Sequence, residues 1–410
     1  MHSELRNPFS SPTGRRTARA LAGALALALA VSCAQQQPED ATVKLNQLFD
    51  DYWEYQMREY PTWASALGDR RYDSLLTDES QAAHDRRLTQ HRNFLNRLNA
   101  IDRYQLAETD QVSADIFELQ LSQFVEGARF NDQYMPINQQ GGPHLALPEL
   151  ISALTFTSYT DYENFYKRMQ AFPRYIDQHI KNMRAGMDAG LVSAKINIEP
   201  TLAQMASFIV EDPRSSVFYG PVSDNAAGLA DDDIERLKEM YEGAIEDDIV
   251  PAYRKLKAFV EEEYLPACRE EFGVWALPDG AERYKYLIQY HTTLPLTPEE
   301  IVQTGLDDLA RIEAEMDSII ATVGFEGTRQ DFFDFLHSDP RFYYTDKDSL
   351  LDGYRAILAD VKQHVPTLFG ILPQADCIVK ELEEFRSKDA PTAYYNQPAE
   401  DGSRPGFFYA

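Results

Sequence analysis

The sequence has 410 residues, of which 66 are acidic and 39 are basic, so its formal net charge at pH 7 is −27. A surface this acidic repels nucleic acid and anionic lipid, which excludes both as partners. Aromatic residues make up 12% of the chain, which is typical of a packed globular protein and not of an acidic disordered one. Because the chain is longer than one hydrophobic core usually fills, we expect two lobes or one large helical domain.

The N-terminal residues predict an export signal of the lipoprotein type. Four arginines precede an apolar run over residues 21–31, which consists almost wholly of alanine and leucine. A membrane-spanning helix needs about 20 apolar residues, so this run is a signal-peptide core. It ends at Ser32-Cys33, which resembles the lipobox of bacterial lipoproteins, although Ala30 stands where that pattern prefers leucine. The alternative is an ordinary secretory peptide that is cleaved nearby.

Three segments follow from this interpretation: a signal peptide over 1–32, a lipidated polar tether over 33–40, and a helical domain over 41–410. The mature chain would begin at Cys33 and carry a net charge near −30. We expect it to be anchored by lipid at the cell envelope, in the outer membrane facing the periplasm, because the residue after the cysteine is alanine and not aspartate. Cys268 and Cys377 are expected to be two separate buried thiols, with a disulfide in an oxidising compartment as the alternative.

Apolar residues recur at steps of three and four along most of the remaining chain, which predicts helices. The first three amphipathic stretches cover residues 42–60, 88–98 and 109–128. Residues 136–148 are rich in proline and glycine and predict a substantial loop. A helix is then expected to begin near Tyr162, and Phe172-Pro173 should interrupt it before the pattern continues.

The second half of the chain continues this helical pattern. An amphipathic stretch covers residues 233–264, and Pro251 should kink or divide it. Thr297-Pro298-Glu299-Glu300 is the clearest helix start. Thr297 and Glu300, three residues later, can form a capping box, and proline suits the first turn of a helix. The stripe that follows should be buried. It consists of Ile301, Leu309, Ile312, Met316 and Ile319.

A last helix should open at Thr345 with Asp348 and end before Pro366. Strand signals are few and occur at residues 393–395 and 406–409, with a weaker one at 194–198. The predicted fold class is therefore mostly α: a large helical domain with a few short strands near its C-terminal end.

The usual motifs of hydrolases and nucleotide-binding proteins are missing from the sequence. It contains no phosphate-binding glycine loop, no Gly-x-Ser-x-Gly elbow and no His-Glu-x-x-His helix. His84 and His91 share a helical face, but two turns separate them by about 10 Å, which is too far for one metal ion. We expect them to be ordinary surface or boundary residues. The run Glu261-Glu262-Glu263 is expected to be a solvated face, since consecutive helical residues diverge.

Five markers occur in a fixed order over nearly the whole mature chain, and together they resemble the bacterial family called domain of unknown function 885. The markers lie at residues 61–73, 136–139, 264–293, 296–306 and 394–406. The first begins Pro-Thr-Trp-Ala-Ser-Ala-Leu-Gly-Asp, and the last ends Asp-Gly-Ser-Arg-Pro-Gly. From its residues alone, the last marker indicates a hairpin or a crossing loop, because turn residues separate two β-prone segments.

The resemblance implies a helical protein of the zinc-peptidase type, often lipid-anchored, in which a His-Glu-x-x-His helix and a later glutamate bind zinc. In that family the zinc helix follows the segment similar to residues 402–409, whereas this sequence stops at Ala410. We therefore assign no catalytic or metal-binding residue and expect no cofactor in this chain, with zinc expected only in a full-length relative. By position in the family, the residues that would border the substrate cleft, as donors to a peptide backbone or carboxylate, are Tyr394, Tyr395, Ser403 and Arg404.

In the leading interpretation, the chain is the N-terminal portion of an exported lipoprotein of zinc-peptidase type and is inactive as it stands. Its partners would be a peptide-like substrate and the membrane that holds its anchor. The alternative is a lipid-anchored helical binding or scaffold protein without catalysis, and a third is a hydrolase whose site has no recognisable motif. Gly406 to Tyr409 predicts an apolar strand with an unpaired edge at the end of the chain. On this ground we expect the coding sequence to continue, with the zinc helix encoded downstream.

Overall fold

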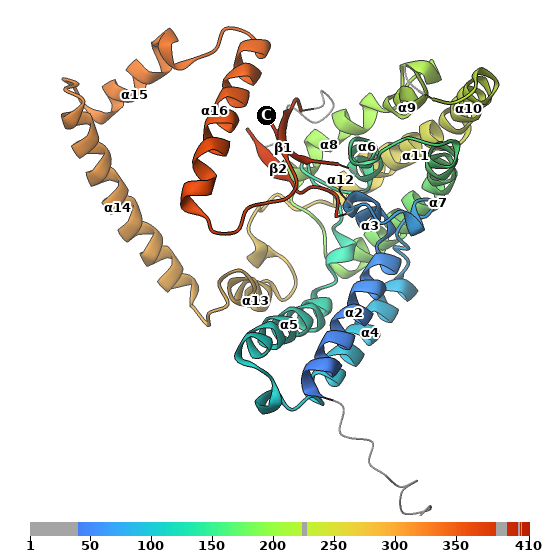
Figure 1. Cartoon of the computed structure of the whole chain (residues 1–410), viewed down its shortest axis with the longest axis horizontal. Coiled ribbons are helices and arrows are strands. Elements are labelled where there is room, and N and C mark those ends of the chain that lie inside the picture. The colour runs from blue at the N-terminus through green and yellow to red at the C-terminus, as the bar shows by residue number, and fades with distance from the viewer. Residues whose placement is uncertain (1–39, 224–227, 383–391, 401, 403) are drawn as a thin grey trace, which may run out of the picture.

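A computed structural model describes residues 40–223, 228–382, 392–400, 402 and 404–410. The predicted signal peptide and nearly all of the tether lie outside the described residues; Asp40 alone is described, and its carboxylate accepts a hydrogen bond from the amide of Thr42 to cap the first described helix. Helices dominate, and a three-stranded sheet lies near the C-terminus, which confirms the mostly α prediction (Figure 1). Among the described residues, no helix is both long and apolar enough to cross a membrane.

An N-terminal bundle contains α2 (Ala41–Glu59), α3 (Pro61–Leu67), α4 (Gln81–Asn99) and α5 (Glu108–Gly127). The three predicted amphipathic stretches correspond to α2, α4 and α5, and their apolar faces meet in one core. Leu45 and Leu48 of α2 pack there with Phe94 of α4 and with Phe117 and Leu121 of α5. Pro61 begins α3 because a proline in the first turn sacrifices no helical hydrogen bond.

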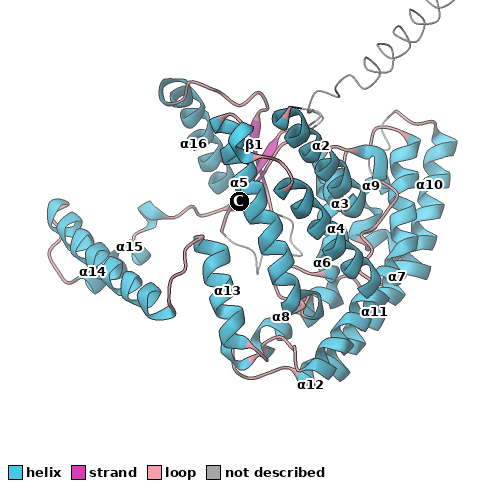
Figure 2. Cartoon of the chain, turned by 90° about the horizontal axis from the view of Figure 1, so that it is seen from below, coloured by secondary structure: helices cyan, strands magenta, loops and turns pink. Residues whose placement is uncertain are grey.

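The central body is built from α6 (Pro143–Ala153), α7 (Tyr159–Ala189), α8 (Lys195–Ser207), α9 (Gly220–Ser223), α10 (Asp231–Ala244), α11 (Val250–Phe259) and α12 (Leu265–Ala267). Its core is the larger of the two and centres on α7, α10 and α11 (Figure 2). The three glutamates at 261–263 are exposed, as predicted.

Prolines interrupt this body less than the sequence predicts. Residues 136–142 form the expected loop, but the rest of that segment belongs to α6, with Pro148 inside it. The carbonyl of His144, which Pro148 cannot pair, accepts a hydrogen bond from the hydroxyl of Tyr253 at 2.8 Å. The predicted break at Pro173 is wrong, because α7 continues through it with a buried stripe on both sides. The chain around Pro251 stays helical: a five-residue π-helix, Ile245–Ile249, joins α10 to α11, and Pro251 lies in the first turn of α11.

The weak strand signal at 194–198 is also wrong. α8 begins at Lys195, and strand-like pairing there is limited to one bridge between Ala194 and Arg269. Ile198 is buried in the core of the body, so helical packing overrides its β-propensity there.

The last helices form an arm that leaves the body through α13 (Gly280–Thr292) and continues as α14 (Pro298–Thr322), α15 (Arg329–Ser338) and α16 (Lys347–Leu368) (Figures 1 and 2). The predicted capping box of Thr297 and Glu300 is confirmed. The predicted burial of the α14 stripe is wrong, since Leu309, Met316 and Ile319 are exposed. The reason is that α14 lies away from the body in both views.

The start and end of α16 also differ from the sequence prediction. Asp346 caps the helix through the amide of Ser349, so the cap lies one residue later than expected. The helix includes Pro366 in its last turn and ends at Leu368.

The small sheet contains β1 (Cys377–Lys380), β2 (Tyr394–Asn396) and β3 (Gly406–Tyr409) in the order β1-β3-β2. β3 pairs with β1 in parallel and with β2 in antiparallel orientation. The expectation of an unpaired edge at the chain end is therefore wrong, because β3 is the central strand. Cys377 of β1 and Cys268 are both free thiols, as expected, but each is half-buried and not buried.

Candidate functional site

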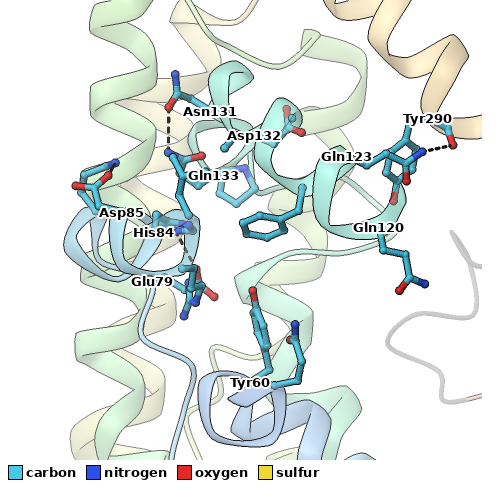
Figure 3. Close-up of a pocket in the computed structure, with 18 of the residues that line it drawn as sticks. Tyr60, Glu79, His84, Asp85, Gln120, Gln123, Asn131, Asp132, Gln133 and Tyr290 are labelled. Carbon is cyan, nitrogen blue, oxygen red and sulfur yellow. Dashed lines mark hydrogen bonds and ion pairs between the residues drawn. The ribbon is translucent and has the colours of Figure 1, made fainter. Parts of the chain in front are cut away.

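A cavity of about 1080 Å³ lies where the N-terminal bundle meets α7, α13 and the segment from 127 to 136 (Figure 3). Each wall comes from a different part of the chain, so the cavity exists only in the folded protein. α2 and α4 supply one side, and α5 with the following turn supplies the opposite side. α13 closes the remaining side through Tyr286, Leu287 and Tyr290.

Two kinds of uncharged side chain dominate this lining. The first kind is aromatic and consists of Tyr52, Tyr60, Trp63, Phe124, Tyr286 and Tyr290. The second kind is the primary amide and consists of Gln56, Gln81, Gln120, Gln123, Asn131 and Gln133. A primary amide carries both donors and an acceptor, as a peptide group does, so it can pair with either half of a peptide bond.

The aromatic wall is held in place by contacts behind it. The ring of Phe124 stacks on the imidazole of His91 with a centroid distance of 3.6 Å, and the Nδ1 of His91 donates to the carbonyl of Arg87 at 2.8 Å. His91 is therefore a buried supporting residue and not the surface or boundary residue predicted from sequence. Burial lowers the pKa of this imidazole below its ordinary value, so it is neutral at pH 7.

Gln123 joins α5 to α13 across the cavity. The side-chain amide of Gln123 donates to the main-chain carbonyl of Tyr290 at 3.3 Å. The main-chain carbonyl of Gln123 accepts a hydrogen bond from the hydroxyl of Tyr286 at 2.9 Å. Gly127 permits this approach, since a Cβ there would overlap the Tyr286 hydroxyl. The position of the α13 wall therefore depends on the absence of a side chain at residue 127.

An ionic cluster lies at the α4 and α7 side of the cavity. The carboxylate of Glu79 is 3.1 Å from the Nε2 of His84 and 3.6 Å from the guanidinium of Arg87. Burial opposes ionisation of Glu79, but its bond with His84 and the charge of Arg87 outweigh burial and lower the pKa of the carboxyl. Glu59 is also 3.4 Å from Arg87, so these charges are paired within the protein.

His179 of α7 lies near Glu79 and His84 of this cluster and also lines the cavity. It is buried, and neither ring nitrogen has a hydrogen-bond partner among the described residues. Burial lowers its pKa to about 4, against the attraction of Glu79, so the ring is neutral at pH 7. Its edge packs on the ring of Tyr175 with a centroid distance of 4.6 Å. The described residues contain no group of three His, Cys, Asp or Glu side chains that could hold a metal ion.

A buried arginine fixes the segment that presents Trp63 and Glu79. Arg168 of α7 is fully buried and donates to the hydroxyl of Ser65 at 2.7 Å, to the carbonyl of Pro61 at 3.2 Å and to the carbonyl of Leu75 at 2.9 Å. The Ser65 hydroxyl lies 2.5 Å from the carboxylate of Asp73. The first sequence marker, residues 61–73, is thus a structural unit that Arg168 holds against the body.

The residues predicted to flank a substrate cleft lie elsewhere. Arg404 is buried and donates to the carbonyl of Ala66 at 2.7 Å, at the C-terminal end of α3, where the helix dipole favours a cation. Tyr394 stacks on Tyr409 within the sheet at 5.0 Å, and Tyr395 is exposed. None of these three lines the cavity, and Ser403 and Cys33 lie outside the described residues. The first and last markers therefore meet at α3, a contact that the sequence does not predict.

The cavity cannot be recognised from the sequence, because the amides that line it follow no motif. Gln120 and Gln123 are one turn apart on α5, which was the available signal, but Gln56 and Gln133 come from segments far away in sequence. Of the scattered histidines, His84 and His179 reach the cavity, and the sequence does not distinguish them from the others.

The family model of bacterial proteins of unknown function, DUF885, matches residues 61–410, so the chain belongs to this family. Among solved structures, the chain is similar to a candidate lipoprotein from Colwellia psychrerythraea, with 20% identity, a TM-score of 0.78, and coverage of 90% of this chain and 67% of that one. A candidate lipoprotein of unknown function from Shewanella oneidensis shows 17% identity, a TM-score of 0.56, and coverage of 91% and 64%. At these identities the likeness shows the fold alone. No curated protein matches the chain.

Proposed function

We propose that this member of the DUF885 family binds a peptide-like ligand in the cavity between the N-terminal bundle, α7 and α13. The observation that carries the proposal is the lining, which contains six primary amides and six aromatic side chains. We further propose that the protein works outside the cytoplasm, anchored at the envelope by lipid on Cys33. The sequence before residue 40 and the two similar candidate lipoproteins support this location.

The charges of the lining favour an uncharged, hydrogen-bonding ligand. Glu79 is paired with His84 and Arg87, and Asp132 is paired with Arg283. A ligand charge would have to compete with these pairs. Several of the amides also bond within the protein, as Gln81 does to Asp85 and Gln133 to Asn131. A primary amide has two N–H donors and an oxygen acceptor, so one internal bond leaves it further capacity for a ligand. An extended peptide backbone supplies matching groups at regular intervals, and its apolar side chains suit the aromatic rings.

The size of the cavity agrees with such a ligand. Sites for small ligands commonly measure roughly 300–1,000 Å³ and combine apolar walls with a few polar groups. The volume of about 1080 Å³ lies just above this range, which suits a short oligopeptide better than a single amino acid. Hydrolysis is what the family resemblance implies for relatives that carry a zinc helix; peptide binding is the part of that activity that the described residues support.

Tryptophan fluorescence offers a direct test, because the chain has three tryptophans and Trp63 lines the cavity. Trp275 is exposed and lies outside the cavity lining, so a Trp275→Phe background removes its signal. The full chain in detergent would be titrated with tetraalanine. We expect a saturable change in fluorescence, and calorimetry under the same conditions should give the same dissociation constant.

The matched variants are Gln120→Ala and Gln303→Ala. Both glutamines are exposed and helical, but Gln120 lines the cavity and Gln303 lies on α14, where its amide bonds to Asp307. Loss of one hydrogen bond of about 1 kcal/mol should weaken binding by roughly fivefold in Gln120→Ala and leave Gln303→Ala unchanged. Absence of tetraalanine binding, or an equal loss in both variants, would contradict the proposal.

A further inference from the structure

A second, smaller pocket adjoins the cavity on its α2 and α5 side. Its volume is about 340 Å³, and it shares Tyr52 and Gln120 with the larger cavity. Its other principal walls are Phe49, Trp53, Ile116 and Phe117. No charged side chain lines it, and its polar side chains other than Tyr52 are Ser113 and Gln120. The pocket is therefore adjacent to the cavity but differs from it in chemistry.

The floor of this pocket is a rigid set of aromatic rings. The centroids of Tyr52 and Phe117 are 4.9 Å apart at an interplanar angle of 73°, and those of Phe49 and Phe117 are 5.2 Å apart at 80°. Edge-to-face contacts of this kind are favourable and leave ring faces and edges available to a further aromatic group.

Two tryptophans link the pocket to the cavity. Trp53 lines the pocket and Trp63 lines the cavity, and their rings meet at 5.8 Å and 67°. They are 40% and 42% exposed, which is unusual for two large apolar side chains in contact with each other. Exposed apolar surface beside a polar site is typical of a surface that becomes buried when a ligand binds.

We propose that the smaller pocket binds an aromatic or large aliphatic side chain of the same ligand whose backbone lies in the cavity. This inference rests on the proposed function and adds a preference to it. Transfer of a charged side chain into an uncharged, apolar pocket is costly, so acidic and basic side chains should be rejected. A small side chain would leave the pocket unfilled and should bind more weakly.

The test compares tetraalanine with tetrapeptides in which phenylalanine replaces one alanine at each position in turn. We expect the best phenylalanine peptide to bind at least about tenfold more tightly than tetraalanine, and a lysine or glutamate at the same position to give no gain. Absence of any preference for phenylalanine, with tetraalanine still bound, would overturn the inference and leave the proposed function intact.

Two positions on α5 provide a matched pair of variants. Ile116 lines the pocket and Val112, one turn earlier, does not, although their exposures are 53% and 54%. Ile116→Asp should abolish the preference for phenylalanine while affinity for tetraalanine stays the same, and Val112→Asp should change neither. Equal thermal midpoints for the two variants would show that both are folded. Survival of the preference in Ile116→Asp would overturn the assignment to this pocket.

A single capped amino acid distinguishes binding in the pocket from binding in the cavity. N-acetylphenylalaninamide presents the side chain with little backbone, so in the Trp275→Phe background it should alter the fluorescence of the remaining tryptophans, and Ile116→Asp should remove this change. If tetraalanine fails to bind while the capped phenylalanine binds in this way, the proposed function is wrong and the apolar pocket stands. If the capped residue and all peptides fail, both are wrong.

Discussion

Replacement of Arg168 by methionine should destabilise the protein more than any surface substitution on the same helix. The guanidinium is fully buried and binds four oxygens, those of Ser65, Pro61, Tyr72 and Leu75, at 2.7 to 3.3 Å. Methionine fills a similar length but donates no hydrogen bond, so the four oxygens lose the bonds from Arg168, although the Ser65 hydroxyl and the carbonyls of Pro61 and Tyr72 each keep another bond. The segment from α3 to Leu75 would then lose its main attachment to α7.

The size of this effect follows from two opposing contributions. Hydrogen bonds to a charged group are worth about 2 kcal/mol each, which makes roughly 8 kcal/mol for four. Burial lowers the pKa of Arg168 from 12.5 to about 10, so removal of the charge restores roughly 3 kcal/mol. The expected net loss in the free energy of unfolding is about 5 kcal/mol, near the cost of breaking other buried charge networks.

Arg184 provides the matched control, because it also lies on α7 and binds Glu263 through two bonds of 2.6 and 3.0 Å, but on the exposed surface. Arg184→Met should cost no more than about 1 kcal/mol. Urea denaturation followed by circular dichroism measures both variants, and Arg168→Lys, which retains a charge but a different donor geometry, should fall between them. Similar losses in Arg168→Met and Arg184→Met would refute the reasoning.

Three further predictions concern the cavity wall, pH and the anchor. Gly127→Ala should displace Tyr286 and weaken tetraalanine binding severalfold in a fluorescence titration, whereas Gly243→Ala, where a Cβ meets open space, should not; equal effects would exclude the proposed contact. Burial lowers the pKa of His144 from 6.5 to about 4 in the folded protein. Between these two pH values the imidazole is protonated in the unfolded chain but not in the folded one, so the free energy of unfolding should fall as pH drops from 7 toward 4. Urea midpoints at pH 7 and 5 should differ less in His144→Asn, and an unchanged difference would contradict this. Cys33→Ser should lose lipid labelling and accumulate as a precursor, and labelling that persists would show that the lipobox assignment is wrong.

Much of the fold could be predicted because helical periodicity depends on local sequence. The buried faces of α2, α4, α5, α7 and α10 follow from the spacing of their apolar residues, and the capping box of α14 follows from Thr297 and Glu300. Periodicity identifies an apolar face but does not show what covers it. The stripe of α14 was therefore predicted correctly as apolar and wrongly as buried.

The errors at prolines have a tertiary cause. Pro148 leaves the carbonyl of His144 without a helical partner, and the hydroxyl of Tyr253, 105 positions later in the chain than Pro148, provides one. β1 was missed for a related reason, since Cys377 to Lys380 is a short segment that becomes a strand by pairing with β3. Neither partner can be recognised from the local sequence.

The candidate site was the least predictable part of the molecule. Its lining extends from Tyr52 to Tyr290, and glutamine carries no motif that marks it as a ligand-binding residue. The family markers include positions that support the fold, as Ser65 and Arg404 show through their bonds with Arg168 and α3. The markers therefore include residues that hold the chain together, whereas the proposed ligand site rests on the geometry of the cavity.

Photo-crosslinking tests the central claim most directly. A tetrapeptide of alanine with one p-benzoylphenylalanine would be irradiated with the full chain, and the modified residues would be identified by mass spectrometry. Peptide binding in the cavity predicts adducts in α2, α5 and the segment from 127 to 136, which excess unlabelled tetraalanine should suppress. Adducts confined to the exposed apolar stripe of α14, or adducts that tetraalanine does not suppress, would contradict the account.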